Sequence, residues 1–174
     1  MSSSFKTRLR KRKARNKRAA NKAAIRSAVH EVGHYVTKSR LYPNRSFELS
    51  LERKGGHVFG KLIDLENPDS LDPPIVMIEV SIAGVIFESF RIDLLDSAFD
   101  RLMNTNALRS DRDKFVYAKG QLKLTSGSPY AVFDGIDLCF ASVLPQIIKD
   151  LEDFGWINVQ RLASKLVKER KVVL

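Results

Sequence analysis

"AIRSAVHEVGHYV", residues 24–36, carries two of the three histidines of this 174-residue chain, four positions apart, with a glutamate directly after the first. Apolar residues recur around them at steps of three and four, which predicts an amphipathic helix over about residues 19–39. On a helix, positions i and i+4 lie on one face with Cβ atoms about 6 Å apart, so His30 and His34 could bind one metal ion. Glu31 could then take a proton from a water molecule activated by that metal.

The H-E-x-x-H letters also occur by chance on amphipathic helices, so the motif indicates zinc hydrolysis without establishing it. The single cysteine, Cys139, excludes a cysteine-rich zinc module, so any metal must be held by histidines and carboxylates. Gly33 lowers helix stability by about 1 kcal/mol relative to alanine. We therefore expect Gly33 to have a functional role, keeping the helix face open where a substrate would approach.

The rest of the chain predicts an α+β fold that is mostly helical, with a small sheet beside the first helix. Residues 46–53 alternate between apolar and polar side chains and residues 57–64 do so less regularly, with two glycines between them, which predicts a β-hairpin. Residues 75–90 are too apolar for a surface helix and too short for a membrane span, so we expect a buried core helix. After a mostly polar stretch, three further helices are expected, from about Ser110, over 130–152 and over 156–170. Five aromatic residues are assigned to packing: Phe115, Phe133, Phe140, Phe154 and Trp156.

The net charge of +10 is concentrated at the N-terminus. Residues 1–26 contain eleven lysines or arginines and no acid. Residues 27–174 contain the other 19 basic residues and all 20 acidic ones, so their net charge is −1. We expect a basic tail over residues 1–22 and one folded domain over 23–174. Residues 6–26 could bind a polyanion or an acidic partner. The alternative is a solubilising tail or a positively charged helical extension with no specific partner.

No apolar run approaches the roughly 20 residues that span a bilayer, and the basic N-terminus is not followed by an apolar signal region. The sequence therefore predicts a cytoplasmic protein without a transmembrane segment. A homo-oligomer is compatible with it.

The segment R-S-A-V-H-E-V-G-H, residues 26–34, resembles the opening of the zinc peptidase domain of FtsH-type AAA proteases, which has the pattern R-x-A-x-H-E-x-G-H. The hairpin region resembles that family's hairpin with a basic-glycine turn. "SIAGVIFESF", residues 81–90, resembles a family helix at Gly84 and Glu88, and "RLASKLVKER", residues 161–170, is similar to its closing helix. The resemblance covers about residues 23–172 and implies a zincin-like peptidase fold.

The resemblance also implies roles for individual residues. "NALRSDRDKFVYA", residues 106–118, is similar to the family segment that holds the third zinc ligand, which assigns that role to Asp111. His57, in the predicted hairpin turn, is the competing candidate for a metal ligand. Glu88 either orients a metal-binding imidazole or pairs with a buried arginine, and both alternatives remain open.

The chain departs from the family pattern in three ways. The threonine-glycine approach to the third ligand is missing, Glu88 is followed by Ser89 instead of a second acid, and the sequence has no ATPase domain or membrane segments. The expected function is a stand-alone metalloendopeptidase that uses Zn²⁺ to hydrolyse peptide bonds in unstructured polypeptides without ATP. The alternative is a catalytically silent peptidase-like adaptor, docked through its basic tail to nucleic acid or to an ATPase partner.

Overall fold

A computed structural model describes residues 3–55, 57–68, 71–91, 95–122 and 135–174. The elements along the chain are α1 (Ser3–Leu41), β1 (Phe47–Lys54), β2 (His57–Asp64), α2 (Pro74–Arg91), η1 (Leu95–Ser97), α3 (Ala98–Asn104), η2 (Asn106–Leu108), α4 (Arg109–Leu122), α5 (Ile136–Phe154), α6 (Trp156–Glu169) and β3 (Lys171–Val173). The predicted α+β class with mostly helical content is confirmed.

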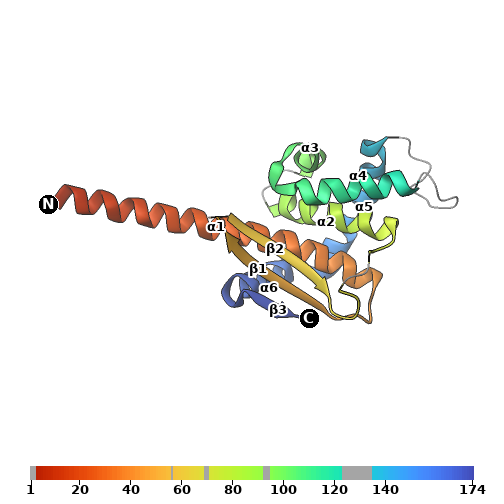
Figure 1. The fold of residues 1–174 in the computed structure, drawn as a ribbon, viewed down its shortest axis with the longest axis horizontal. Helices are drawn as coiled ribbons and strands as arrows, with labels where there is room; N and C mark the ends of the chain where they lie inside the picture. The colour runs from red at the N-terminus through yellow and green to blue at the C-terminus, as the bar shows by residue number, and fades with distance from the viewer. Residues whose placement is uncertain (1–2, 56, 69–70, 92–94, 123–134) are drawn as a thin grey trace.

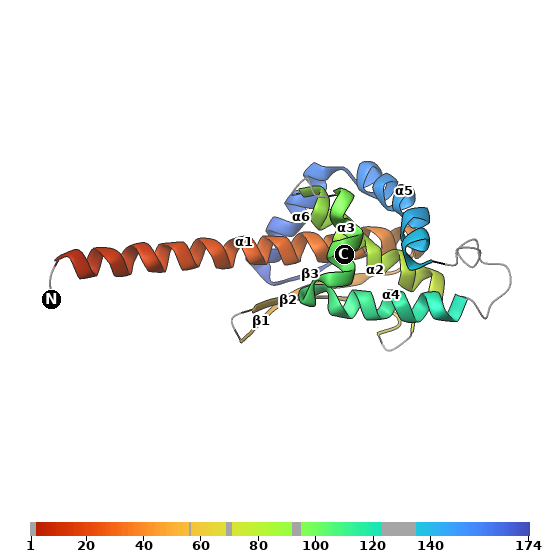
Figure 2. The same cartoon turned by 90° about the horizontal axis from the view of Figure 1, so that it is seen from above.

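Helix α1 is the central element of the molecule. It packs against α2, α5 and α6 and against both strands of the hairpin. Figure 1 shows α2 to α5 on one side of α1 and the sheet with α6 on the other, while the N-terminal part of α1 extends away from both; Figure 2 shows the same extension from above. The helix begins at Ser3, well before the predicted start near residue 19, because the basic segment continues the helix without a break. The first fully buried side chain described in α1 is that of Ala24.

The sheet contains the predicted hairpin and one strand that was not predicted. Strands β1 and β2 pair antiparallel, with Leu51 opposite Gly60, and β3 pairs antiparallel with the other edge of β1. The order β2-β1-β3 makes β2 an edge strand. β3 was missed because its three residues are too short to show an alternating pattern.

Helix α2 is the predicted buried core helix, and residues 76, 78, 79 and 81–89 within it are buried. Helix α4 begins at Arg109, one residue before the predicted Ser110. Helices α5 and α6 correspond to the two predicted C-terminal helices, although residues 130–134 of the first prediction, which include Phe133, lie outside the described residues. No helix was expected in the mostly polar stretch before Arg109, yet it contains α3, whose Leu102 is fully buried.

Among the described residues, no helix combines the length and the apolar character needed to cross a membrane.

Candidate metal centre

His30 and His34 lie on the face of α1 that packs against α2, and both are buried. Their ring centroids are 4.5 Å apart and the rings are nearly perpendicular, at 84°. Gly84 of α2 lies directly against both imidazoles: a Cβ atom there would come within 2.6 Å of two His30 ring atoms and 2.7 Å of a His34 ring atom. Since real Cβ contacts are longer than this, only glycine at position 84 leaves room for the histidine pair.

Asp111 joins the two histidines from the first turn of α4. Its Oδ2 lies 2.9 Å from Nε2 of His30, and its Oδ1 lies 3.5 Å from Nε2 of His34. One ligand atom from each of the three residues lies within 4.8 Å of the other two, and all three residues are buried. This group could hold a metal ion, and in the part of the chain that the structure describes it is the one group of its kind.

The outer nitrogen of each imidazole is also placed by a neighbour. Nδ1 of His34 lies 2.6 Å from the backbone carbonyl oxygen of Val80, which can only accept a hydrogen bond, so Nδ1 donates its hydrogen. In the neutral imidazole this leaves the lone pair on Nε2, the atom that faces Asp111. Nδ1 of His30 faces Oε2 of Glu88 at 3.5 Å, which is an ion-pair contact and not a hydrogen bond, so this buried nitrogen has no hydrogen-bond partner among the described residues. Ligating histidines in metalloproteins usually have an outer hydrogen-bond partner that orients the ring and sets its tautomer, and among the described residues His34 has one in Val80.

Glu88 makes contacts that bear on both alternatives left open by the sequence. It is buried, it forms ion pairs with Arg26 of α1 and Arg101 of α3, and it also faces His30. Burial opposes the charged carboxylate, but contact with His30 and the two guanidinium groups lowers the pKa of Glu88 below its ordinary value. A permanent negative charge is therefore held behind His30.

The histidine–aspartate pair carries opposite charges when no metal neutralises Asp111. Burial by itself favours neutral His30, but hydrogen bonds and charge interactions with Asp111 and Glu88 outweigh it and raise the pKa of His30 to about 10. Burial likewise opposes ionised Asp111, while His34 and His30 hold the pKa of Asp111 well below its usual range. Metal ligation requires a neutral imidazole, so a metal ion would displace a proton from His30.

Glu31 lies against the edge strand β2. It is buried, and a Cβ atom at Gly60 would come within 2.1 Å of its Cγ atom, so glycine is required for the strand to pass over this side chain. The Glu31 carboxylate makes no hydrogen bond or ion pair with another described residue, although its charge contributes to the raised pKa of His30. The carboxylate is thus near the metal group and is not committed to a structural partner.

The structure also bears on the roles expected for His57 and Gly33. His57 is exposed at the start of β2, where it pairs in register with Lys54, and it is not part of the metal group. The expected role of Gly33 was wrong: a Cβ atom there would lie 2.8 Å from the carbonyl oxygen of Ala83 and 2.9 Å from the ring of Phe87. Gly33 therefore allows α1 and α2 to approach closely and does not open the helix face to substrate.

The sequence reasoning missed several residues that support the site: Arg26, Gly60, Val80 and Arg101. Arg26 was counted with the basic tail, yet it precedes His30 by four residues and His34 by eight, which places all three on one helix face. That spacing was a signal that could have separated Arg26 from the tail. Val80 acts through its backbone, and Arg101 lies in a helix that was not expected, so neither had a signal in the sequence.

Comparisons with protein-family models, with curated proteins and with solved structures found no match to this chain. What the site can do is therefore argued from its residues and geometry.

Proposed function

We propose that this chain is a zinc-dependent metalloendopeptidase with a domain similar to that of FtsH-type proteases, acting on unstructured polypeptides. One observation carries the proposal: Nε2 of His30 and Nε2 of His34 converge on the carboxylate of Asp111, and Glu31, the residue after His30, lies buried against an edge strand. A purely structural salt bridge does not require two oriented imidazoles and an adjacent uncommitted carboxylate.

The donor set and its spacing fit zinc. Two imidazole nitrogens and one carboxylate oxygen are typical of a catalytic zinc site, which keeps a fourth position open, whereas Mg²⁺ and Ca²⁺ prefer oxygen ligands alone. Tetrahedral ligands at about 2.1 Å from zinc are about 3.4 Å from one another. The separations of 2.9 and 3.5 Å between Asp111 and the two Nε2 atoms lie on either side of that value.

The residues of this chain would share the reaction as follows. His30, His34 and Asp111 would hold Zn²⁺, which supplies Lewis-acid chemistry: it polarises a carbonyl group and makes water more acidic. The carboxylate of Glu31 accepts the proton of the attacking water and passes it to the amine nitrogen that leaves when the peptide bond breaks. The carbonyl of Val80 would hold the His34 ring through its hydrogen bond, and the Glu88 carboxylate would stabilise charge on His30 from behind.

The edge strand supports an extended substrate. In the described sheet, β2 pairs with β1 on one side only, and the pairing brings Gly60 of β2 against Glu31. A polypeptide added along the free edge of β2 would be held by main-chain hydrogen bonds and would pass close to Glu31. Main-chain pairing requires an unfolded segment and gives little sequence preference, which is why the proposed substrates are unstructured polypeptides.

The proposal is tested by measuring the zinc content of the full chain together with its hydrolysis of unfolded casein. We expect about one zinc per chain, hydrolysis that a chelator abolishes, and recovery on adding back one equivalent of Zn²⁺. A chain that binds zinc in this site but cleaves no unfolded polypeptide would instead be the silent adaptor. A chain that binds no zinc would contradict both the metal site and the peptidase.

A further inference from the structure

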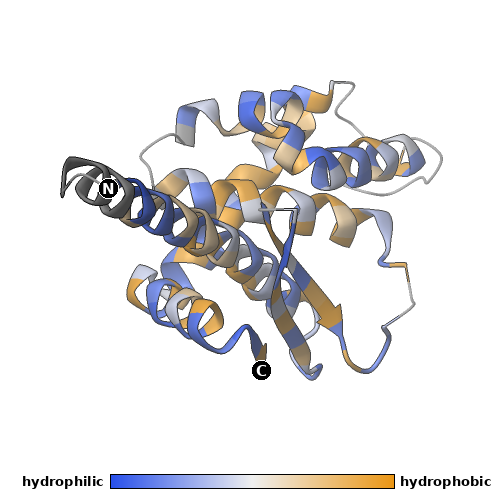
Figure 3. Ribbon diagram, turned by 60° about the vertical axis from the view of Figure 1, so that its left-hand side comes forward, coloured by the Kyte–Doolittle hydropathy of each residue, from blue (hydrophilic) through white to orange (hydrophobic). Residues whose placement is uncertain are grey.

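The N-terminal part of α1 carries charge that the fold leaves uncompensated. We define the basic extension as residues 12–22, within which six basic side chains are exposed and no acid occurs: Arg12, Lys13, Arg15, Lys17, Arg18 and Lys22. None of the six forms an ion pair with a described residue. The first coloured turns of α1 after the N-terminus are accordingly hydrophilic in Figure 3. Uncompensated cations on one rigid element are an electrostatic signature of a polyanion-binding surface.

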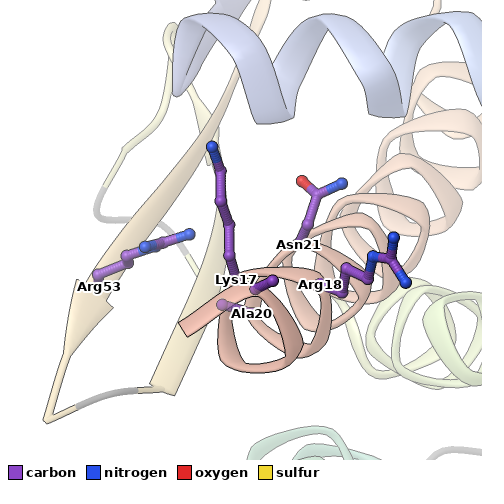
Figure 4. A pocket seen from close by; sticks show the side chains of 6 residues that line it. Lys17, Arg18, Ala20, Asn21 and Arg53 are labelled. Carbon is purple, nitrogen blue, oxygen red and sulfur yellow. The ribbon is translucent and has the colours of Figure 1, made fainter. Parts of the chain in front are cut away.

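A cleft of about 710 Å³ lies where the basic extension passes the hairpin. Figure 4 shows Lys17 on α1 and Arg53 on β1 extending toward the space between the two elements. The described residues that line the cleft include no carboxylate; they are Ala14, Lys17, Arg18, Ala20, Asn21 and Arg53. Arginine and lysine in this arrangement bind phosphate oxygens, the arginine through its planar fork of donors.

The distribution of charge around the helix distinguishes between polyanions. Since successive helical residues are about 100° apart, the six cations of the basic extension surround the helix axis instead of forming one stripe. A helix on a membrane surface needs an apolar face opposite its basic face. The apolar residues of the extension are the three alanines Ala14, Ala19 and Ala20, which provide no such face. A helix enclosed by phosphates on two sides, by contrast, uses cations on opposite faces.

The dimensions of the helix favour one kind of nucleic acid. An α-helix with its side chains is about 10–12 Å wide, and the major groove of B-form DNA is about 12 Å wide. The major groove of A-form RNA is deep and too narrow for side chains to read. Residues 12–22 contain no aromatic side chain to stack on the bases of a single strand.

We propose that the basic extension and Arg53 form a binding site for double-stranded DNA. The extension lies in the major groove, and Lys17 and Arg53 contact the adjacent phosphate backbone from α1 and β1. Phosphate contacts give affinity without sequence information, so binding is largely independent of base sequence. Lys17 precedes His30 by thirteen positions on the same helix, which places the proposed Lys17–phosphate contact about 20 Å along the helix from the metal centre. The proposal does not rest on peptidase activity.

The experiment measures binding of the full chain to a fluorescent DNA duplex of about 20 base pairs, roughly two helical turns, by anisotropy at several salt concentrations. In the double variant Lys17→Ala/Arg53→Ala, we expect affinity at about 0.1 M salt to fall about 10-fold. The slope of log affinity against log salt should become shallower by about two, one for each lost phosphate contact.

The matched control is Arg109→Ala/Lys114→Ala, which removes the same charges from exposed positions on α4. It should keep DNA affinity within about 2-fold of the parent, because screening weakens charge effects beyond about 10 Å. If both double variants lose the same DNA affinity and circular dichroism shows that both remain folded, then binding depends on net charge alone. That result would overturn the proposal. Unchanged binding in Lys17→Ala/Arg53→Ala would also overturn it.

The ligand class is tested with three further probes at equal phosphate concentration: an RNA duplex and a DNA single strand of the same length, and vesicles containing phosphatidylserine. We expect the DNA duplex to bind more tightly than each of the three. Equal or tighter binding of any one of them would overturn the assignment to the DNA major groove.

Discussion

The two parts of α1 differ in whether their cations form ion pairs with the rest of the domain. From Arg26 to Arg40 the helix packs against the rest of the domain, and the cations Arg26, Lys38 and Arg40 form ion pairs with buried or half-buried acids of α2, α5 and the segment before α2. Over residues 12–22 the cations are exposed and make no ion pair with a described residue. Around the packed part, the buried acids Glu79, Glu88 and Asp150 need cationic partners because desolvation of a charge is costly, whereas an exposed cation needs no partner.

This difference explains how one helix could carry both the proposed metal centre and the proposed DNA-binding surface. In the buried part, neighbours position the rings of His30 and His34, and the carboxylates near His30 raise its pKa. In the exposed part, charges stay hydrated and available for a large anionic partner. We expect that a change in one part of α1 leaves the other part unaffected, and variants ordered from the largest expected effect to the smallest test this.

Glu31→Gln should lower casein hydrolysis by about 1,000-fold, because general-base catalysis contributes about 10²–10⁴ and glutamine cannot accept the proton. Zinc content should not change, since the three ligands are intact. Glu52→Gln on the exposed side of β1 is the control and should hydrolyse casein at the parent rate. If Glu31→Gln digests casein as fast as the parent, the catalytic role of Glu31 is wrong.

Asp111→Ala should weaken zinc binding at least about 10-fold, on the scale of losing a group from a metal site. His57→Ala should change zinc affinity by less than about 3-fold, because His57 is exposed and lies outside the metal group. Titrating both variants with zinc against a competing chelator measures the two affinities. A site emptied by His57→Ala but not by Asp111→Ala would exchange the roles of the two residues.

Gly84→Ala should destabilise the protein by about 1–3 kcal/mol, the usual cost of overpacking a core. The added methyl group would collide with both imidazoles, so zinc binding should weaken as well. Gly120→Ala in α4 is the matched control, because a Cβ atom there meets nothing within 4 Å. It should be neutral or stabilise by up to about 1 kcal/mol through helix propensity. Urea unfolding measures both; equal stability of the two variants would show that the centre relaxes around position 84.

Removing residues 1–17 should change the melting temperature by less than about 2 °C, since the described side chains of residues 12–17 are exposed. Zinc binding and casein hydrolysis should also be unchanged, whereas the proposed DNA binding should be lost. A deletion that continues through residue 24 removes the fully buried Ala24 and should lower the melting temperature clearly. A large drop already in the shorter deletion would mean that the extension packs on the domain.

Much of the fold was visible in the sequence because the signals are local. The alternation over residues 46–53 and 57–64 predicted the hairpin, and the continuous apolar run of residues 75–90 predicted the core helix. Helix α3 was missed because its seven residues make fewer than two turns, which is too short for a helical period to stand out. Strand β3 depends on pairing with β1, a partner more than a hundred residues away.

The sequence by itself determined that His30, Glu31 and His34 share one helix, because helical periodicity is a local property. Asp111 was assigned through a resemblance to a known family, and the tertiary structure decided that α4 brings it to the histidines across 81 residues of chain. Only the tertiary structure revealed the roles of Gly33, Gly60 and Gly84, since a missing side chain has meaning only when the atoms that would occupy its space are known. The same holds for Glu88, whose pairing with Arg26 and Arg101 and position behind His30 depend on three helices meeting, which no local pattern records.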